Sequence, residues 1–303
     1  MSVLNKRLHL RILDKKNRVD QNRPLHPDLV RILEERVLIS YVHSSNKLEG
    51  NTLTLGETET VIKGMTVGGK TLTELQETRN HPKAIKYIKE TTQTKKPITE
   101  HTIKHIHELL MREILEEPGT YRTGMITVPG ANFSPPRSIE IPSLIHELVE
   151  WLEHNPWEHS PVELAARFMH RLLAIHPFHD GNGRTARILM NLILLRNGYP
   201  TLTNISYRDR IQYLRALGEA DLGNYVAIVN FIAQSVEGAL TRFLVVIEEL
   251  EVLTLGEAAM VSGYDAKYLN SRARDGSLGA FKDGRNWKIT KGDLEKYVAQ
   301  NKE

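Results

Sequence analysis

The stretch His176-Pro-Phe-His-Asp-Gly-Asn-Gly-Arg-Thr-Ala-Arg187 decides both the fold class and the function of this chain. An apolar run, Ile188-Leu-Met-Asn-Leu-Ile-Leu-Leu195, follows it directly and is typical of a buried helix. The Gly-Asn-Gly turn therefore opens a helix. Backbone N–H groups at a helix start, together with the positive end of the helix dipole, form a site that binds phosphate. We expect an anion-binding turn at residues 181–183.

Four ionisable side chains surround this turn. Arg184 and Arg187 are three positions apart, so they share one helix face, and guanidinium groups there suit phosphate oxygens. Asp180 provides a hard oxygen ligand for Mg²⁺, which commonly accompanies a polyphosphate. His176 precedes Asp180 by one helical turn and is a candidate general base. A base, a metal ligand, an anion-binding turn and two arginines together indicate phosphoryl or nucleotidyl transfer.

Simpler roles for the same residues remain open. A histidine such as His176, taken alone, is more often a hydrogen-bonded core residue than a base. His176, His179 and Asp180 are also a candidate transition-metal site, although two neighbouring arginines would repel a cation. Phe178 is expected to be an apolar anchor for the loop. We favour transfer chemistry, because the flanking residues all fit that one chemistry.

Three segments of the chain resemble the Fic family. Residues 176–187 match the motif His-x-Phe-x-Asp/Glu-Gly-Asn-Gly-Arg-x-x-Arg at every specified position. Residues 118–122 (Pro-Gly-Thr-Tyr-Arg) and 126–130 (Ile-Thr-Val-Pro-Gly) resemble the family's approach to its flap. Ser45-Asn-Lys-Leu-Glu49-Gly50 resembles the inhibitory motif Ser/Thr-x-x-x-Glu-Gly/Asn. Because that motif precedes the core, the chain resembles the subclass with an N-terminal inhibitory helix.

The resemblance implies an all-α fold, with a Fic helical-bundle core and a short β-hairpin flap. It also implies a protein adenylyltransferase, which moves AMP from ATP to a Ser, Thr or Tyr hydroxyl of a target protein or of itself. ATP and Mg²⁺ are the implied cofactors. Gly183 agrees with this activity, since relatives that phosphorylate their targets carry lysine there. Cytidylyl, uridylyl and phosphocholine transfer stay open.

The resemblance also assigns roles to individual residues. His176 takes the proton of the target hydroxyl, and Asp180 holds Mg²⁺. Glu49, with Ser45 one turn earlier, pairs with Arg187 and competes with the γ-phosphate. The residues expected to bind the nucleotide or the target peptide are Val128, Gly181, Asn182, Gly183, Arg184, Arg187 and Tyr213. Tyr213 is equally plausible as a core residue.

Composition agrees with a soluble protein of two or three domains. The 303 residues are 40% hydrophobic and 25% charged, which is ordinary for globular chains. The absence of cysteine excludes disulfides and thiolate metal sites. A net charge of +3 is too small to imply nucleic acid by itself. The N-terminus lacks the apolar core of a signal peptide, and no apolar run reaches the roughly 18 residues of a membrane span. We expect a cytoplasmic protein with no membrane partner.

Helix signals follow one another along the chain. Asp28 can cap a helix that runs through Ser45 and stops at Gly50. Capping boxes at 54–57 and 160–163 open two further helices, and Thr99 can cap another. Residues 118–142 hold five prolines and a short β-like run, which favours a loop or hairpin.

A separate C-terminal region is expected from residue 252. A capping box at 254–257 starts a helix, Gly263 ends it, and Asp265 caps a second helix. Asp283-Gly284 indicates a hairpin, and a helix over 291–298 closes the chain. This order resembles a small winged helix-turn-helix domain of the excisionase type. Residues 254–303 carry nine Lys/Arg and seven Asp/Glu, which is weak electrostatic support for DNA binding.

We therefore expect three regions: an N-terminal helical region (1–97) with the inhibitory motif, a Fic catalytic core (98–251) and a winged helix-turn-helix-like domain (252–303). Two alternative functions remain beside adenylyl transfer. In one, the protein is a regulator that reads DNA through its C-terminal domain. In the other, it is a de-AMPylating hydrolase in which Glu49 orients a water molecule. Assembly as a homo-oligomer is also left open.

Overall fold

The computed structural model describes residues 2–94, 96–128 and 134–301. Their contacts divide the chain into two compact units. The first unit consists mainly of Glu34–Val229, and the second combines Val3–Leu33 with the residues from Asn230 onward. The division falls inside two long helices, α2 (Pro27–Leu48) and α10 (Val226–Ile247). Each unit is described separately below.

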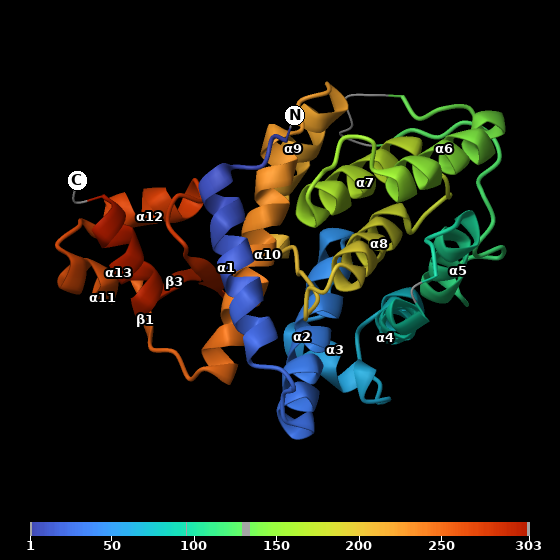
Figure 1. Ribbon diagram of the computed structural model, residues 1–303. Coiled ribbons are helices and arrows are strands. Elements are labelled where there is room, and N and C mark those ends of the chain that lie inside the picture. The colour runs from blue at the N-terminus through green and yellow to red at the C-terminus, as the bar shows by residue number, and fades with distance from the viewer. Residues whose placement is uncertain (1, 95, 129–133, 302–303) are drawn as a thin grey trace. The chain divides into compact units, whose positions relative to one another are not determined.

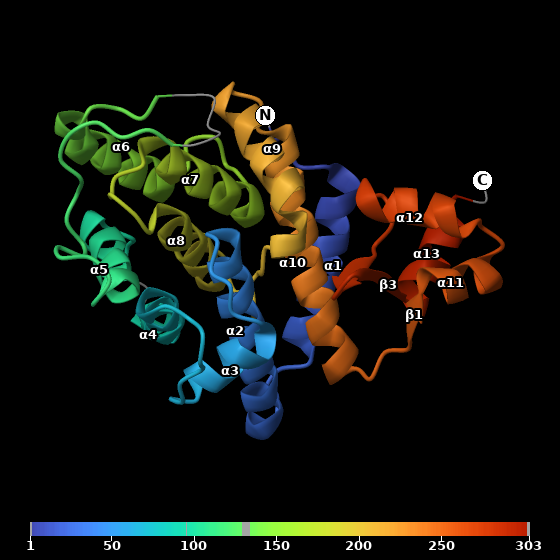
Figure 2. The ribbon, with the colours of Figure 1, turned by 180° about the vertical axis from the view of Figure 1, so that it is seen from behind.

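The first unit is a bundle of helices around a buried central helix, α8. Its other helices, in addition to the end of α2, are α3 (Leu55–Ile62), α4 (Leu72–Thr94), α5 (Glu100–Met111), α6 (Ile141–His154), α7 (Pro161–Ile175), α8 (Asn182–Arg196) and α9 (Arg210–Asp221). Short 3₁₀ turns occur at Ser138–Glu140 and Tyr207–Asp209. Figures 1 and 2 show α7 alongside α8, with α4 and α5 on other sides of it. The side chains from Arg184 to Leu194 are all buried, which confirms the buried helix expected after the motif.

Side-chain caps set the starts of several of these helices. Thr54 and Glu57 form the expected reciprocal capping box at α3, with Thr54 N–H donating to Glu57 Oε2 at 2.7 Å. Ser160 accepts from the N–H of Glu163 at 3.3 Å, with proline at the first position of α7. The expectation for Asp28 was wrong: α2 begins at Pro27, so Asp28 lies inside the first turn. Proline fits the first helical position because a backbone N–H at that position would have no hydrogen-bond partner within the helix, so its absence costs nothing.

Irregular backbone connects α5 to α6. Residues 112–128 and 134–137 contain no paired strand, so the described part of the expected hairpin flap is a loop. The remaining flap residues, including Pro129 and Gly130, lie outside the described residues.

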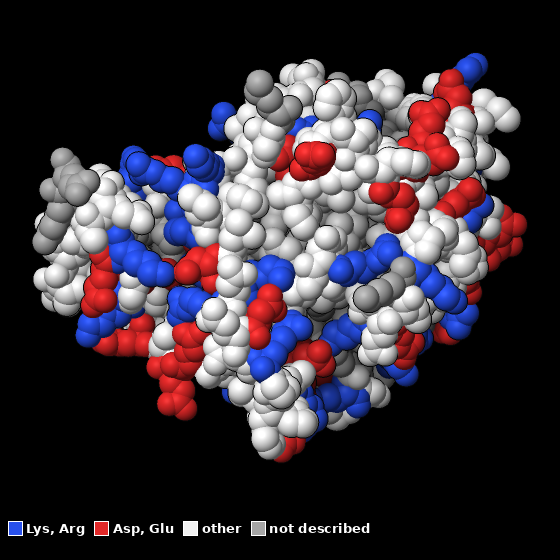
Figure 3. Space-filling model, in the orientation of Figure 1, with Lys and Arg blue, Asp and Glu red and all other residues white. Residues whose placement is uncertain are grey.

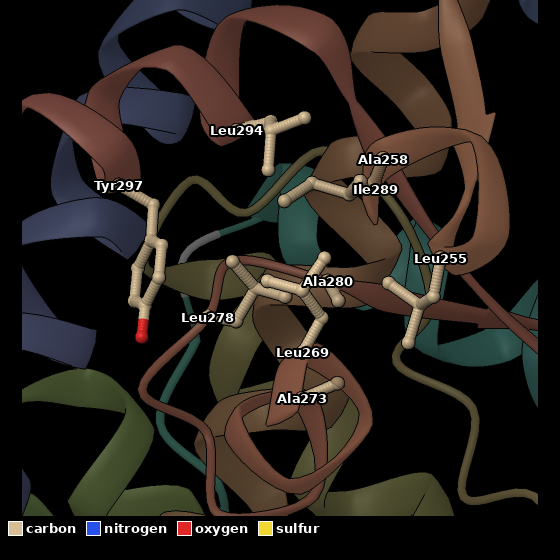
Figure 4. Close-up of a cluster of buried hydrophobic side chains, with 9 residues drawn as sticks. All are labelled: Leu255, Ala258, Leu269, Ala273, Leu278, Ala280, Ile289, Leu294 and Tyr297. Atoms are coloured by element: carbon tan, nitrogen blue, oxygen red, sulfur yellow. The ribbon is translucent and has the colours of Figure 1, made fainter. Parts of the chain in front are cut away.

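The second unit contains the expected C-terminal pattern of helices and a hairpin. Its elements are α1 (Lys6–Gln21), the greater part of α10, β1 (Val252–Thr254), α11 (Leu255–Ser262), α12 (Ala266–Arg274), β2 (Phe281–Asp283), β3 (Asn286–Thr290) and α13 (Lys291–Gln300). The three strands form an antiparallel sheet in the order β1-β3-β2, in which Leu253 pairs with Ile289. The strand β1 was not predicted. Figure 4 shows the apolar cluster of this unit, in which Leu278 and Ala280 lie between the α12 residues Leu269 and Ala273 and the α13 residue Leu294.

A buried cluster of charges also joins elements of the second unit. Lys15 of α1, only 1% exposed, contacts Glu237 of α10 at 3.0 Å and Asp293 of α13 at 3.1 Å. Arg11 contacts the same Glu237 at 2.7 Å. Buried charges persist only when they are paired in this way. These ion pairs link α1 and α10 to α13, which lies beyond the expected domain boundary at residue 252. The division of the chain into three regions stays a prediction.

Charged side chains of both signs are scattered among uncharged residues on the molecular face seen in Figure 3. Over the C-terminal region, basic and acidic groups are interspersed rather than gathered by sign.

None of the helices in residues 2–94, 96–128 and 134–301 combines the length and the apolar character that a membrane span requires.

Candidate functional site

The motif begins where α7 ends. His176 caps α7 in the left-handed backbone conformation, with φ +49°, and its N–H donates to the carbonyl of Leu172 at 3.0 Å. This conformation is uncommon for a residue other than glycine and often marks functional sites. It turns the chain sharply from α7 into the loop that leads to α8.

The ring of His176 is held as a neutral base. Its Nδ1 lies 3.3 Å from the carbonyl oxygen of Leu173. Because a carbonyl can only accept, Nδ1 carries the hydrogen and the neutral ring keeps a lone pair on Nε2. Burial, aided by the positive charge of Arg122, lowers the pKa of His176 below its ordinary 6.5. The structure therefore presents the expected base in its proton-accepting form at neutral pH.

The loop between the two helices is closed by Asn182. Its Oδ1 accepts the N–H of Phe178 at 3.0 Å, and its Nδ2 donates to the carbonyl of the same residue at 2.8 Å. Phe178 is fully buried, as expected of an anchor. The Asn182 amide thus holds the loop, while its expected contact with phosphate stays a prediction.

His107 of α5 supports the same loop and was not predicted. The N–H of Gly119 donates to its Nδ1 at 2.8 Å, so its Nε2 donates to the carbonyl of Asp180 at 2.9 Å. Its ring stacks on Phe178, with centroids 3.7 Å apart. Burial lowers the pKa of His107 to about 4, which keeps the ring neutral. Its place on the apolar face of a helix was the only signal in the sequence.

Both motif glycines are required by close contacts. Gly181 has φ +76°, and a Cβ there would lie 2.6 Å from the sulfur of Met111. A Cβ at Gly183 would collide with the Glu49 carboxylate and lie 3.0 Å from Arg187 Nη1. The start of α8 therefore has room beside its backbone only because these side chains are absent. The first N–H groups of a helix have no partner within it, so this backbone suits an anion.

Arg187 is buried against the end of α2. Its Nε donates to Ser45 Oγ at 3.0 Å, and its Nη2 donates to the Ser45 carbonyl at 2.9 Å and to Glu49 Oε1 at 2.7 Å. The Arg187 side chain is 3% exposed, whereas that of Glu49 is 36% exposed. The structure thus brings together the three residues that the inhibitory motif was expected to join.

Arg184 has a different set of partners. Its Nη1 donates to Glu77 Oε1 of α4 at 2.6 Å, and its Nη2 lies 3.3 Å from Asp180 Oδ2. Glu77 was not predicted. Asp180 accepts the N–H of Gly181 at 2.6 Å, yet its side chain is 61% exposed. An accessible carboxylate beside a helix N-terminus fits Mg²⁺, which takes one or two protein carboxylates and keeps its other positions for water and phosphate.

Arg122 ties the flap region to His176, the expected base. Its side chain is buried, and its Nε donates to the His176 carbonyl at 2.8 Å. Its Nη1 donates to the carbonyl of Gly124 at 2.9 Å, and its Nη2 to that of Pro136 at 2.6 Å. Arg122 therefore contacts both ends of the loop that was expected to form the flap. The sequence analysis assigned no role to Arg122.

Two further residues were predicted from the sequence, Val128 and Tyr213. Val128 is half-buried and is the last described residue before the gap at 129–133. Tyr213 is 3% exposed and its hydroxyl donates to the sulfur of Met169 at 3.7 Å. Its role as a nucleotide contact stays a prediction, and its burial agrees with the core alternative. Within the described part of the chain, no three His, Asp or Glu side chains form a metal-binding group.

Comparison with known proteins identifies relatives of the chain. The Fic/DOC family matches residues 97–194, which include the whole motif. The protein adenylyltransferase Fic of Nematostella vectensis is 34% identical over 208 residues, which are 67% of this chain and 48% of that protein. The chain thus spans about half the length of the curated relatives that it matches.

Solved structures agree with this match. A Fic domain containing signaling protein from Bacteroides thetaiotaomicron superposes with a TM-score of 0.73 at 29% identity, covering 79% of this chain and 98% of that chain. A Fic family protein from Desulfovibrio desulfuricans G20 shares the fold, with a TM-score of 0.67 at 21% identity over 95% of this chain and 97% of that chain. These likenesses confirm the expected fold class. Its motif, its helical core and its relatives together show that the chain carries a Fic domain and belongs to the Fic/DOC family.

Proposed function

We propose that the chain is a protein adenylyltransferase that uses ATP and Mg²⁺. The observation that carries the proposal is the site around the start of α8. There a neutral His176, an exposed Asp180 carboxylate and two motif arginines surround a glycine-lined helix N-terminus. Curated relatives named protein adenylyltransferase, 30–34% identical to the chain, support the same activity.

In the proposed reaction, the hydroxyl oxygen of a Ser, Thr or Tyr side chain forms a bond to the α-phosphorus of ATP. The bond from that phosphorus to the bridging oxygen breaks, and pyrophosphate leaves with the electron pair. His176 Nε2 takes the hydroxyl proton. Asp180 would hold Mg²⁺, which neutralises charge on the phosphates when bound. The N–H groups at the start of α8 stabilise the negative charge that develops at the α-phosphate.

We further propose that Glu49 inhibits this reaction. Its carboxylate takes a donor of Arg187 and covers Gly183, so it occupies space and charge that a triphosphate would need. Since Glu49 is the more exposed partner, it is the group that leaves when the nucleotide binds in the active arrangement. The same carboxylate could orient a water molecule, so removal of AMP remains the alternative reaction of this site.

Labelling with α-³²P-ATP and Mg²⁺ tests the proposal. The parent chain and its Glu49→Gly variant are each incubated with the labelled nucleotide, alone or with an added cell extract. Label bound to protein is counted, and the label found in parallel reactions with chelator is subtracted. Parallel incubations with labelled CTP and UTP distinguish the nucleotide. Absence of protein-bound label from ATP in a folded Glu49→Gly protein would contradict adenylyl transfer.

DNA binding by the C-terminal region is a second candidate. The helices α11 and α12 followed by the β2–β3 hairpin have the winged helix-turn-helix order expected from the sequence, and α12 exposes Lys267 and Arg274. Affinity for duplex DNA that falls steeply with salt, and that weakens in a Lys267→Ala, Arg274→Ala variant, would support this function. Binding that is absent or independent of salt would exclude DNA binding as a function.

The cytoplasmic location stays a prediction.

A further inference from the structure

Glu77 of α4 contacts the motif from outside it. Its Oε1 accepts from Arg184 Nη1 at 2.6 Å, across 107 positions of sequence. The side chains are 13% and 2% exposed, so the pair is largely shielded from water. Charge-assisted hydrogen bonds of this length are strong and directional. The contact therefore constrains where the guanidinium lies.

The other oxygen of Glu77 is also held. Asn51 donates from Nδ2 to Glu77 Oε2 at 2.8 Å, and the same amide group lies 3.1 Å from the carbonyl of Glu74. Asn51 is buried. With one partner on each oxygen, the Glu77 carboxylate is held in a single orientation before it meets Arg184.

Arg184 passes this constraint on to Asp180. A guanidinium is planar and its donors are fixed relative to one another, so holding Nη1 also sets the position of Nη2. Nη2 faces Asp180 Oδ2 at 3.3 Å. The Arg184 Nε is buried and has no hydrogen-bond partner in the described part of the chain, so Glu77 and Asp180 are the side chains that orient this arginine.

The two motif arginines therefore differ in what they can do. Arg187 pairs with Glu49, which is 36% exposed and lies directly after the last residue of α2, so that contact can open. Glu77, which pairs with Arg184, is less exposed than Glu49, and each of its two carboxylate oxygens accepts a hydrogen bond. Arg184 is thus held in place, whereas Arg187 can exchange its carboxylate for a phosphate.

We propose that Glu77 is a positioning residue, which holds Arg184 so that Arg184 orients the Asp180 carboxylate for the metal–nucleotide complex. This inference rests on the proposed function, because it assumes that Asp180 holds Mg²⁺. It assigns Arg184 chiefly to Asp180 and leaves the outer phosphates mainly to Arg187. Groups that orient a metal ligand typically change metal affinity by about tenfold to hundredfold when removed.

Calorimetric binding of a non-hydrolysable ATP analogue tests the proposal without relying on turnover. The full-length protein carries Glu49→Gly so that Arg187 is available, and Kd is measured in Mg²⁺ and again in chelator. Glu77→Ala should weaken binding in Mg²⁺ about tenfold or more, and should leave binding in chelator within about twofold. Glu77→Gln, which keeps an oxygen acceptor and the side-chain shape, should lie between Glu77→Ala and the parent.

Glu74→Ala is the matched control. Glu74 lies one turn earlier on α4 and also holds the segment after Glu49, accepting from Thr52 N–H at 2.8 Å and Oγ1 at 2.6 Å. No contact of Glu74 with Arg184 is present among the described side chains, so this variant loosens the segment without releasing Arg184. It should leave the Mg²⁺-dependent part of the affinity unchanged.

The outcomes separate the possible explanations. A ratio of the two Kd values that is unchanged from the parent in Glu77→Ala, with the parent's unfolding temperature, would overturn the positioning role, as would a Glu77→Gln variant that loses more Mg²⁺-dependent affinity than Glu77→Ala. An equal effect in Glu74→Ala would also overturn it, because anchoring of the segment would then explain the loss. If the parent itself binds the analogue no better in Mg²⁺ than in chelator, the proposed metal role of Asp180 fails instead, whatever Glu77 does.

Discussion

The guanidinium of Arg187 donates to the carboxylate of Glu49 across 2.7 Å, although the two residues are 138 positions apart in the chain. The arginine is buried and the carboxylate is partly exposed. The contact joins the end of α2 to the helix that carries the motif. A competitor for Arg187, such as a phosphate oxygen, can therefore displace Glu49 without unfolding α8.

Replacing Glu49 by glycine should raise self-labelling from α-³²P-ATP. Loss of one charged hydrogen bond of about 1.5–3 kcal/mol frees Arg187, which corresponds to roughly ten- to hundredfold better use of ATP. Lys47→Gly is the control, because it loosens the same helix end and leaves the Arg187 partner in place. Equal labelling of the Glu49→Gly and parent proteins, at matched folding, would remove the inhibitory role.

Replacing His176 by alanine should abolish labelling and leave nucleotide affinity within about twofold. In the proposed reaction His176 acts on the proton, whereas the α8 backbone and Arg187 hold phosphate, and a positioned base contributes about 10²–10⁴-fold. Analogue binding and label incorporation are measured on the same Glu49→Gly preparation. Near-normal labelling by the alanine variant would mean that another group takes the proton.

The acid limb of the pH profile should fall below pH 6.5. His176 must be neutral to accept a proton, and burial, with Arg122, lowers its pKa from 6.5. The rate of transfer should therefore fall to half of its plateau at a pH below 6.5, where half of the His176 side chains are protonated. Initial rates of the Glu49→Gly protein give the midpoint. A midpoint above the ordinary histidine value would be incompatible with this environment.

Stability should fall as the pH drops from 6.5 toward 4, in part because of His107. Burial holds its folded-state pKa at about 4, so the unfolded chain binds the proton first and is favoured on acidification. From pH 7 to pH 5 this residue should cost about 2 kcal/mol of unfolding free energy. Urea unfolding at both pH values compares the parent with His107→Gln. The same pH dependence in both proteins would contradict the assigned pKa.

Replacing Lys15 by methionine should destabilise the second unit by about 3 kcal/mol. The change removes the buried cation that pairs with Asp293 and, together with Arg11, with Glu237, so the buried carboxylates lose part of their compensating charge. Lys16→Met, which removes a partly exposed pair with Asp20 within the same helix, should cost less than about 1 kcal/mol. Urea unfolding measures both, and equal effects would show that the buried cluster contributes little.

Local features of the fold and site could be predicted from the sequence. The capping boxes, the Gly-Asn-Gly turn that opens α8 and the buried apolar run depend on neighbours within a few positions, and the Ser45–Glu49 spacing was informative because it resembled a known motif. Glu77, His107 and Arg122 could not be predicted in this way. Their partners are 107, 73 and 54 positions away, so only the folded packing shows that they touch.

The buried cluster around Lys15 also has a consequence for the order in which the chain folds during synthesis. The helix α1 and its N-cap Asn5 leave the ribosome long before their partners Asn230, Glu237 and Asp293. At about 5–20 residues per second, α1 waits roughly ten to forty seconds for Glu237 to be made. Its apolar face, formed by Leu8, Ile12 and Val19, stays uncovered for that time, while residues 34–229 can already fold. A nascent chain that stalls before residue 230 would therefore display a lone amphipathic helix, which chaperones would be expected to bind.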